Sequence, residues 1–311
     1  MDRSNALNLL LHRITCEIEM IVVTGATGNI GSQVLANIMK SDRQVRVIAR
    51  NPSKLPPEAV ARVEIIEGSH GDFDTVMRAF DGAEAAFWLV TGDPSAPSAE
   101  AAYVEFSRPG VEAMKAHGLK RVVGISALGR GWPKAAGHVT ATIKLDDLIA
   151  TAGASYRALA CGSLMETILR QAPSIRDRGV FYWPSSGDFK MRAVATRDVA
   201  EVASQFLLDP SWTGVEDVPL MGPDDVSFDE MARTLSEVLG KPVVFQPISM
   251  EDMREMMIGR GATEGMAQAM IDMLTAKNEG MDHLLPRTTT PLTPTTFRQW
   301  AELVLKPSIG A

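Results

Sequence analysis

The fold is decided by residues 21–31, which read Ile-Val-Val-Thr-Gly-Ala-Thr-Gly-Asn-Ile-Gly. Three β-branched residues predict a strand, and three glycines follow it at intervals of three and open into an amphipathic stretch. In such a run the first glycine permits a tight turn, the second lets the backbone approach a pyrophosphate, and the third lets the helix pack close to the strand. The N–H groups that begin the helix then face the phosphates. The residues predicted to hold a dinucleotide are Gly25, Thr27, Gly28, Asn29, Ile30 and Gly31.

From Met20 onward, short β-branched runs alternate with longer amphipathic stretches. This alternation predicts an α/β fold with a Rossmann-like, doubly wound parallel sheet covered by helices. The predicted strands are residues 21–23, 44–49, 63–66, 85–90, 121–125 and 156–160. The predicted helices are residues 32–39, 75–80, 99–117 and 142–151.

After Cys161 the alternation weakens, which indicates a smaller and mainly helical C-terminal lobe. Residues 179–188 predict a loop and hairpin, 198–208 a helix, and 288–296 a loop. Ser227 with Glu230 forms a capping-box pattern, so residues 227–239 predict a helix that ends at Gly240. Residues 250–277 predict two helices broken around 259–261. The expected organisation is a non-core extension (1–19), an NADP-binding Rossmann domain (20–160), and a substrate-binding lobe (161–311) with some segments returning to the Rossmann sheet.

Composition narrows the class of protein. The 311 residues are 45% hydrophobic and 22% charged, as is typical of a soluble globular chain. A net charge of −7 makes nucleic acid an unexpected partner. The two cysteines, Cys16 and Cys161, provide neither a disulfide framework nor a zinc site, so no metal and a cytoplasmic location are expected. The apolar patch at residues 6–11 is too short for a signal peptide or a membrane span.

The end of the second predicted strand indicates which cofactor binds. An acidic residue there would accept the ribose hydroxyls of NAD, but residues 44–54 contain no Asp or Glu. Arg50, Asn51 and Lys54 stand there instead, and a guanidinium with a nearby ammonium suits a 2′-phosphate. NADP(H) is therefore the predicted cofactor, although a solvated basic pair after a strand is the alternative.

Later segments carry a family resemblance. Residues 45–54, 71–74, 193–200, 222–228 and 240–243 resemble the NmrA-like branch of the atypical short-chain dehydrogenases/reductases, with its quinone-reductase and isoflavone-reductase-like relatives. The resemblance implies that Asp72 and Phe73 lie against the adenine and that Val90, Thr91, Ser126 and Ala127 line the cofactor. It also implies that Gly162 flanks the nicotinamide, with Leu164 and Met165 on the substrate side.

The usual acid/base pair is missing. Classical short-chain dehydrogenases use a Tyr and a Lys four residues apart, whereas Tyr103, Tyr156 and Tyr182 are followed at that distance by Ser107, Ala160 and Ser186. The isoflavone-reductase-like relatives imply a lysine fourteen residues before the aromatic of the sixth strand, where this chain has Thr142.

Three candidates for catalysis follow from this comparison: His138, Thr142 and Lys144. Lys144 lies two residues beyond the implied position, and His138 one helical turn before it. The alternatives are a loop histidine at 138, a solvated Lys144, and core positions for Tyr103 and Tyr156. Cys161 lacks a basic neighbour or a second thiol, so it is interpreted as a small buried residue.

These features favour NADPH-dependent reduction of a quinone or a conjugated or aromatic carbonyl compound, because such acceptors need little proton transfer from the protein. Residues 250–281 hold eight of the seventeen methionines. They predict a cover for a flat, aromatic, small-molecule substrate contacted by Met257 and Met270, or two helices packed on the core. A non-catalytic NADP(H) sensor that binds a protein partner is the alternative function, and nucleotide-sugar epimerisation is disfavoured. No membrane partner is expected, and a homo-oligomer is left open.

Overall fold

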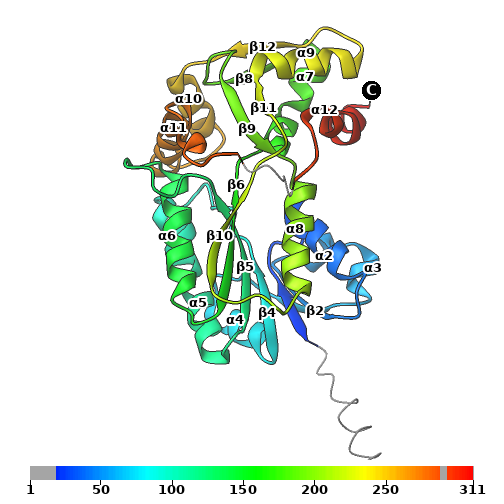
Figure 1. Ribbon diagram of the computed structural model, residues 1–311, viewed down its shortest axis with the longest axis vertical. Coiled ribbons are helices and arrows are strands. Elements are labelled where there is room, and N and C mark those ends of the chain that lie inside the picture. The colour runs from blue at the N-terminus through cyan, green and yellow to red at the C-terminus, as the bar shows by residue number, and fades with distance from the viewer. Residues whose placement is uncertain (1–18, 288–292, 311) are drawn as a thin grey trace, which may run out of the picture.

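The structure is a computed structural model that describes residues 19–287 and 293–310 (Figure 1). The predicted extension, apart from Glu19, and part of the predicted loop at 288–296 lie outside the described residues. The carboxylate of Glu19 pairs with Arg43 at 2.7 Å and with Arg121 at 3.3 Å. The last residue of the predicted extension thus contacts the first lobe.

Seven parallel strands form the central sheet in the order β10-β6-β5-β4-β1-β2-β3. They are β1 (Met20–Val23), β2 (Gln44–Ala49), β3 (Glu64–Glu67), β4 (Ala83–Trp88), β5 (Arg121–Ala127), β6 (Ser155–Cys161) and β10 (Val215–Leu220). The order reverses between β1 and β4, which is where doubly wound sheets bind their ligands. The predicted Rossmann-like fold is confirmed.

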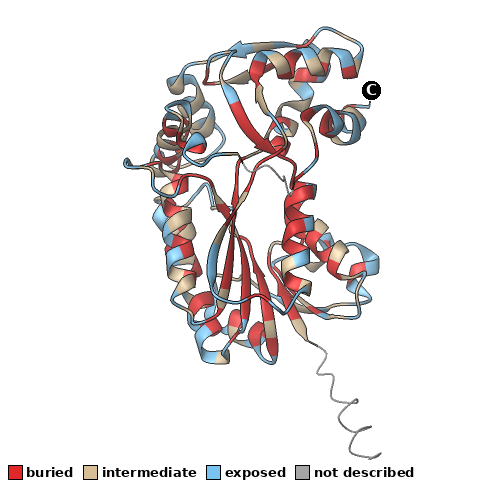
Figure 2. Cartoon of the chain, in the orientation of Figure 1, coloured by how far each residue is buried: buried red, intermediate tan, exposed pale blue. Residues whose placement is uncertain are grey.

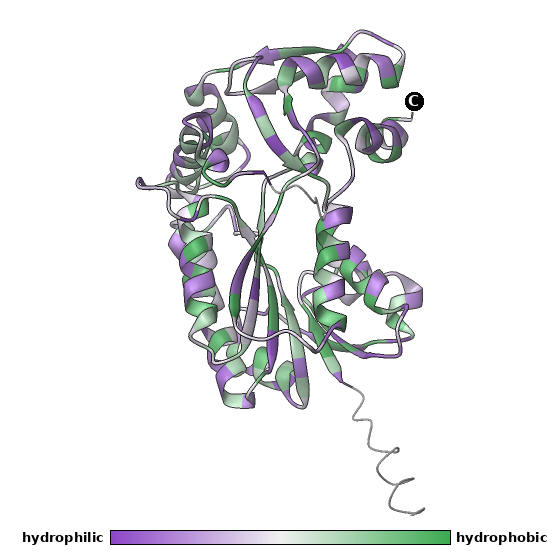
Figure 3. Ribbon diagram, viewed as in Figure 1, coloured by the Kyte–Doolittle hydropathy of each residue, from purple (hydrophilic) through white to green (hydrophobic). Residues whose placement is uncertain are grey.

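Helices cover both faces of this sheet (Figures 1 and 2). One face packs on α2 (Asn29–Ile38), α3 (Pro57–Val60) and α8 (Thr196–Leu208). The other packs on α4 (Phe73–Phe80), the π-helical turn η2 (Ala101–Glu105), α5 (Phe106–His117) and α6 (His138–Ala150). In β1, Ile21 and Val23 enter the first core and Val22 the second, as strand alternation requires. Figure 3 shows hydrophobic and hydrophilic residues alternating along these helices, because each buries only one face.

The C-terminal lobe has its own core, which includes Met165, Phe181, Phe228 and Trp300. Its helices are α7 (Ala172–Arg178), α9 (Phe228–Leu239), α10 (Met250–Gly259), α11 (Glu264–Asn278), α12 (Phe297–Trp300) and α13 (Lys306–Ser308). Its short helical turns are η3 (Met165–Gln171), η4 (Met281–His283) and η5 (Ala301–Leu305), while a further turn, η1 (Pro52–Lys54), belongs to the first lobe. Its strands are β7 (Ser163–Leu164), β8 (Val180–Trp183), β9 (Lys190–Val194), β11 (Asp225–Ser227) and β12 (Val244–Pro247). The lobe therefore contains two small sheets as well as helices.

The helix predictions for this lobe are confirmed. Ser227 and Glu230 make both hydrogen bonds of a capping box, and Gly240 ends α9 in the left-handed conformation with a φ of 66°. α10 and α11 are separated by residues 260–263, at the predicted break. Within the first lobe, α6 begins at His138, four residues earlier than predicted, so this histidine is helical.

The predicted hairpin at 179–188 is wrong. β8 pairs in parallel with β12, more than sixty residues later in the chain, where Val180 lies opposite Val244. Local turn residues indicated that the chain reverses there, but a parallel pair needs a crossover, which local pattern does not reveal. The fourth strand also differs, because β4 ends at Trp88 and leaves Val90 in the loop that follows.

One further property concerns helix length. Within residues 19–287 and 293–310, every helix is too short or too polar to pass through a bilayer.

Candidate functional site

The glycine loop lies at the carboxyl end of β1, beside the point where the strand order reverses. Gly25 has a φ of +66°, which glycine adopts without strain. A Cβ on Gly31 would stand 2.2 Å from the carbonyl oxygen of Gly25, so any side chain at Gly31 would separate the helix from the loop. A Cβ on Gly28 would meet that oxygen at 3.4 Å, which is a tolerable contact. The three glycines thus serve different steric needs.

The start of α2 is open to a ligand. Gly28 is the N-cap residue and no side chain caps the helix there, so the N–H groups of the first turn are left for another partner. Thr27, Gly28 and Asn29 are exposed, while Ile30 is buried beneath them. This uncapped, exposed helix start fits a pyrophosphate, which N–H groups and the helix dipole would hold.

Thr24 fixes the loop to the neighbouring strand, a role that the sequence interpretation missed. Its buried hydroxyl donates to the carbonyl of Phe87 at 3.0 Å and accepts from the backbone N–H of Leu89 at 2.8 Å. Leu89 in turn packs where a Cβ on Gly25 would stand, 2.8 Å from its Cδ2. The two strands that flank the switch point are therefore held together at the loop itself.

The basic residues after β2 lie at the same edge of the sheet. Arg50, Asn51 and Lys54 are exposed, and Asn51 accepts hydrogen bonds from the backbone and hydroxyl of Ser53. Hydrogen bonds from Ser95, with a smaller contribution from the charge of Arg50, lower the pKa of Asp93 in the loop after β4. The charge of Arg50 therefore reaches the loop that follows β4.

The charge of Arg50 also reaches His70, a half-buried histidine in the loop between β3 and α4. Burial, together with this charge, lowers the pKa of His70 from 6.5 to about 4. His70 packs edge-on against Trp88 and Phe106 at 5.1 and 4.8 Å between ring centroids. His70 is therefore a neutral ring in this loop.

Residues 72 and 73 begin α4 on the outer side of this gap. Asp72 is the N-cap, and its carboxylate accepts from the backbone N–H of Thr75 at 2.9 Å and from its hydroxyl at 2.7 Å. These bonds lower the pKa of Asp72. Phe73 is 45% exposed, which is unusual for a phenyl ring and leaves a flat apolar face for an adenine. Val90 is half-buried and Thr91 exposed in the loop after β4.

A buried polar network lies beneath the end of β5. Ser126 donates to the carboxylate of Asp146 on α6, and the hydroxyl of Tyr156 donates to the same carboxylate at 2.6 Å. Burial raises the pKa of Asp146 to about 7, although these two hydrogen bonds oppose the effect. Tyr156 is buried as expected, but it is one member of a network. Ser126 therefore turns its hydroxyl toward α6, while the half-buried Ala127 is the next residue along the edge.

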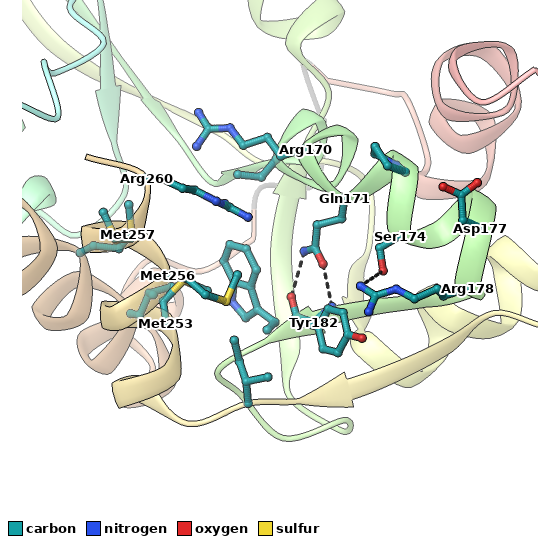
Figure 4. A pocket seen from close by; sticks show the side chains of 16 residues that line it. Arg170, Gln171, Ser174, Asp177, Arg178, Tyr182, Met253, Met256, Met257 and Arg260 are labelled. Carbon is teal, nitrogen blue, oxygen red and sulfur yellow. Dashed lines mark hydrogen bonds between the residues drawn. The ribbon is translucent and has the colours of Figure 1, made fainter. Parts of the chain in front are cut away.

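A second hollow lies in the C-terminal lobe, a pocket of about 700 Å³ between α10 and α11 on one side and η3, α7 and β8 on the other (Figure 4). Its apolar lining comprises Trp183, Ile248, Met253, Met256, Met257, Met270 and Leu274. No residue of α10 is fully buried, so this helix covers the pocket without being part of a core. Met257 and Met270 are among the residues that line this pocket.

The methionines of residues 250–281 divide between two roles. Met266 and Met281 are buried, and they pack with residues of η2, α6 and the end of β5. The four that line the pocket are only partly buried or exposed. The segment therefore contributes methionines both to buried clusters and to the lining of the pocket.

Two predicted substrate residues lie elsewhere. Met165 is 2% exposed and belongs to the core of the C-terminal lobe, and Leu164 packs against the first core of the sheet. Gly162 is buried, and a Cβ there would stand 2.5 Å from the carbonyl oxygen of Arg192. This segment carries the chain from β6 directly into η3, which lines the pocket.

Comparison with known proteins decides the family. The family described as NAD(P)H-binding matches residues 25–210, which include the glycine loop. The chain belongs to this NAD(P)H-binding family. Its predicted place among atypical short-chain dehydrogenases/reductases is confirmed, and the chain is an oxidoreductase that binds NAD(P)H.

Three relatives illustrate the similarity. The chain is 30% identical to a (4-alkanoyl-5-oxo-2,5-dihydrofuran-3-yl)methyl phosphate reductase of Streptomyces griseus, over 78% of this chain and 81% of the relative. It is 27% identical to an NAD(P)H azoreductase of Xenophilus azovorans (82% and 86%) and 26% identical to quinone oxidoreductase 2 of Escherichia coli (84% and 89%). The crystal structure of E. coli QOR2 with NADPH has the same fold, with a TM-score of 0.74 at 24% identity over 90% of this chain and 98% of that one.

The three predicted catalytic residues of this NAD(P)H-binding protein lie in the first half of α6. His138 is 9% exposed and packs edge-on against Tyr103 at 5.8 Å, and burial lowers its pKa. The hydroxyl of Thr142 donates to the carbonyl of His138 at 2.9 Å. The ammonium of Lys144 is half-exposed and pairs with Glu100. Two of the three polar groups are thus engaged within the protein.

Several residues of the site were not predicted. Trp183, Arg170 and Arg260 line the pocket, and Asp146 binds the hydroxyl of Ser126 near the end of β5. Arg260 stood in the noted break between the two helices, so its position was visible but its role was not. Cys161 is 5% exposed and burial raises its pKa to about 12, which confirms that it is a small buried residue.

Proposed function

We propose that this protein is an NADPH-dependent reductase of quinones or of conjugated or aromatic carbonyl compounds. The observation that carries the proposal is the methionine-lined pocket of about 700 Å³ in the lobe that faces the cofactor edge. A pocket of this size and lining suits a flat, largely apolar acceptor. The azoreductase and the quinone oxidoreductase named above support this substrate class.

One wall of the pocket packs against the first lobe. α11 supplies Met270 and Leu274 to the pocket. The same helix packs on the start of α6, where a Cβ on Gly137 would stand 1.8 Å from the carbonyl oxygen of Ala269. On this basis we assign residues 20–160 to cofactor binding and 161–311 to the substrate, with α8 and β10 returning to the first lobe.

We assign the preference for NADPH to Arg50, with Lys54 beside it. Arg50 is exposed, its side chain makes no hydrogen bond or ion pair with any described residue, and its charge contributes to the lowered pKa of Asp93 in the loop after β4. Its planar guanidinium suits a 2′-phosphate. Thr27, Gly28 and Asn29 would hold the pyrophosphate, and Asp72, Phe73, Val90, Thr91 and Ala127 would line the rest of the cofactor.

The bound cofactor supplies a hydride to the acceptor. The chain supplies orientation, because Trp183 and the pocket methionines hold a flat ring and exclude water from its faces. Proton delivery is a smaller task, since the reduced oxygens of a quinone can take protons from water. Among the side chains of α6, His138 is the candidate for a hydrogen bond to the acceptor, because Thr142 and Lys144 already have partners.

The test is oxidation of NADPH, followed by its absorbance, with a panel of quinones, enones and azo compounds. We expect turnover with several flat acceptors. We also expect the turnover rate to fall more in His138→Ala than in Lys144→Ala. Tight NADPH binding without turnover of any acceptor would overturn the proposal. That result would favour the alternative, a sensor of NADP(H) that binds a protein partner.

A further inference from the structure

The pocket in the C-terminal lobe is positively charged although the protein is acidic. Arg170, Arg178 and Arg260 line it, and Asp177 is its single acidic lining residue. Asp177 pairs with Arg176 at 2.7 Å, so its charge is already balanced. The chain as a whole carries a net charge of −7. A concentration of positive charge in such a protein is a local feature of the pocket that draws anions.

Two of these arginines lack partners. Arg178 donates to the hydroxyl of Ser174 at 3.0 Å and lies over the ring of Tyr182 at 5.6 Å. The guanidinium groups of Arg170 and Arg260, in contrast, make no hydrogen bond or ion pair with any residue in the described ranges. They extend toward each other from opposite sides of the pocket, from the end of η3 and the end of α10 (Figure 4).

The acidic residues near α10 do not neutralise this pair. Arg254 lies on α10, the helix that ends just before Arg260. It forms ion pairs with both Glu251 and Glu264. Arg260 is the C-cap residue of α10, and the helix dipole favours a cation at that end. The dipole does not occupy the N–H donors of the Arg260 guanidinium. Two guanidinium groups with free N–H donors at one rim of a pocket suit an oxyanion.

We propose that the acceptor of this enzyme carries an anionic group, a sulfonate, carboxylate or phosphate, that is bound between Arg170 and Arg260. The inference rests on the proposed reductase function and names its substrate class. The apolar body of the acceptor lies against Trp183, Met257 and Met270, and the anion lies at the arginine rim. The pocket therefore selects amphipathic, anionic aromatic compounds over neutral ones of the same shape.

The first test measures binding without catalysis. Calorimetry with naphthalene-2-sulfonate and with 2-naphthol compares an anion with a neutral ring of the same shape, and saturating NADP⁺ keeps the sulfonate out of the cofactor's phosphate sites. We expect the sulfonate to bind about tenfold more tightly. Arg170→Gln and Arg260→Gln should each reduce this preference, and the double variant should abolish it while 2-naphthol binding stays constant.

Arg233→Gln is the matched control. Arg233 is an exposed arginine on α9 that does not line this pocket, so its loss changes the net charge equally. The preference should survive in that variant and fall at high salt in the wild type. Naphthalene-2-carboxylate and naphthyl phosphate, titrated in the same way, rank the three anions. Equal binding of sulfonate and naphthol, or a preference that survives the double variant, would overturn the proposal.

A second test separates this inference from the proposed function. The ratio of kcat/KM for 1,4-naphthoquinone-2-sulfonate to that for 1,4-naphthoquinone should fall about tenfold in the Arg170→Gln/Arg260→Gln variant relative to wild type. If both quinones are reduced and the ratio is unchanged, the anion site is wrong and the reductase function stands. If neither is reduced while arginine-dependent sulfonate binding persists, the anion site stands and the reductase function is wrong.

Discussion

The glycine loop and the methionine pocket are built in opposite ways. The loop is one continuous segment, residues 24–31, and acts through its backbone, because a Cβ at Gly31 would collide with a carbonyl oxygen at 2.2 Å. The pocket is assembled from side chains of η3, α7, β8, α10 and α11, which are spread over residues 167–274. A backbone site tolerates little change and is shared by a whole family, whereas a side-chain site can be altered one residue at a time. We therefore expect the loop to conserve chemistry and the pocket to determine the substrate.

The strongest test of this contrast is Gly31→Ala. The added methyl group meets backbone atoms of residues 25 and 26 at 2.2–3.0 Å, so α2 must move away from the loop. We expect a loss of about 3 kcal/mol in the free energy of unfolding and loss of measurable NADPH binding. Denaturant unfolding and titration of NADPH fluorescence measure the two effects.

Gly28→Ala is the control for steric cost. Its Cβ would lie 3.4 Å from the nearest atom, so its effect on unfolding should stay below about 1 kcal/mol. If both variants are equally stable, close approach of helix to loop does not explain the third glycine.

The next largest effect concerns Asp146, whose carboxyl group accepts hydrogen bonds from Ser126 on β5 and Tyr156 on β6. Its pKa is raised to about 7 in the folded protein, so the folded state holds a proton that the unfolded state releases. Stability should therefore fall as the pH rises from about 4 to above 7. Asp146→Asn keeps an acceptor for Tyr156 and removes the charge. We expect it to gain about 2–3 kcal/mol relative to wild type between pH 5 and pH 8.

Asp147→Asn is the matched control. Asp147 is the exposed neighbour of Asp146 and pairs with Arg130 at 2.8 Å. Because this variant retains Asp146, its free energy of unfolding, measured with denaturant at several pH values, should fall with rising pH as in wild type, and the difference between the two proteins should change little with pH. If the free energy of unfolding depended on pH in the same way in wild type and in Asp146→Asn, the pKa of Asp146 would not be raised by folding.

Arg50→Ala tests whether side chains at the cofactor edge can be exchanged as those of the pocket can. We expect NADPH affinity to fall about tenfold to a hundredfold while NADH affinity changes less than about threefold. Arg62→Ala is the control, because Arg62 is an exposed arginine just before β3 and thus at the opposite edge of the sheet. Equal losses for both cofactors would remove Arg50 from the 2′-phosphate site.

The contrast also explains what the sequence could reveal. Six strands of the central sheet, the glycine loop and the capping box of α9 depend on local spacing, and these were predicted to within a few residues. The seventh strand, β10, was not predicted. The parallel pairing of β8 with β12 joins segments more than sixty residues apart, and no local pattern encodes it. Met165 shows another limit of sequence-based prediction. Its position three residues after Gly162 suggested contact with substrate, but its side chain packs in the core of the C-terminal lobe.

The pocket was only half predictable for the same reason. The density of methionines marked α10 and α11, but the residues that complete the wall, Arg170 and Trp183, come from segments with no unusual composition. Likewise Asp146, Ser126 and Tyr156 lie on three elements, and only their packing brings them together. Residues that act as a group across the fold require the structure.

The smallest expected effect, and the sharpest test of the pocket, comes from Met257→Gln and Met270→Gln. Each replaces a partly buried apolar side chain in the pocket wall with a polar one of similar size. We expect KM for flat quinones to rise about threefold to tenfold per variant, with kcat and NADPH affinity nearly unchanged. The reason is that the lost apolar contact stabilises the bound acceptor equally in the ground state and in the transition state.

Met250→Gln supplies the comparison within one helix. Met250 begins α10 and is partly buried, yet it does not line the pocket, so its replacement should leave KM unchanged. An equal rise in KM for all three variants would mean that α10 responds as a unit and that the pocket methionines do not contact the acceptor. A rise confined to Met257 and Met270 would place the flat ring between α10 and α11, because only these two helices carry the affected side chains.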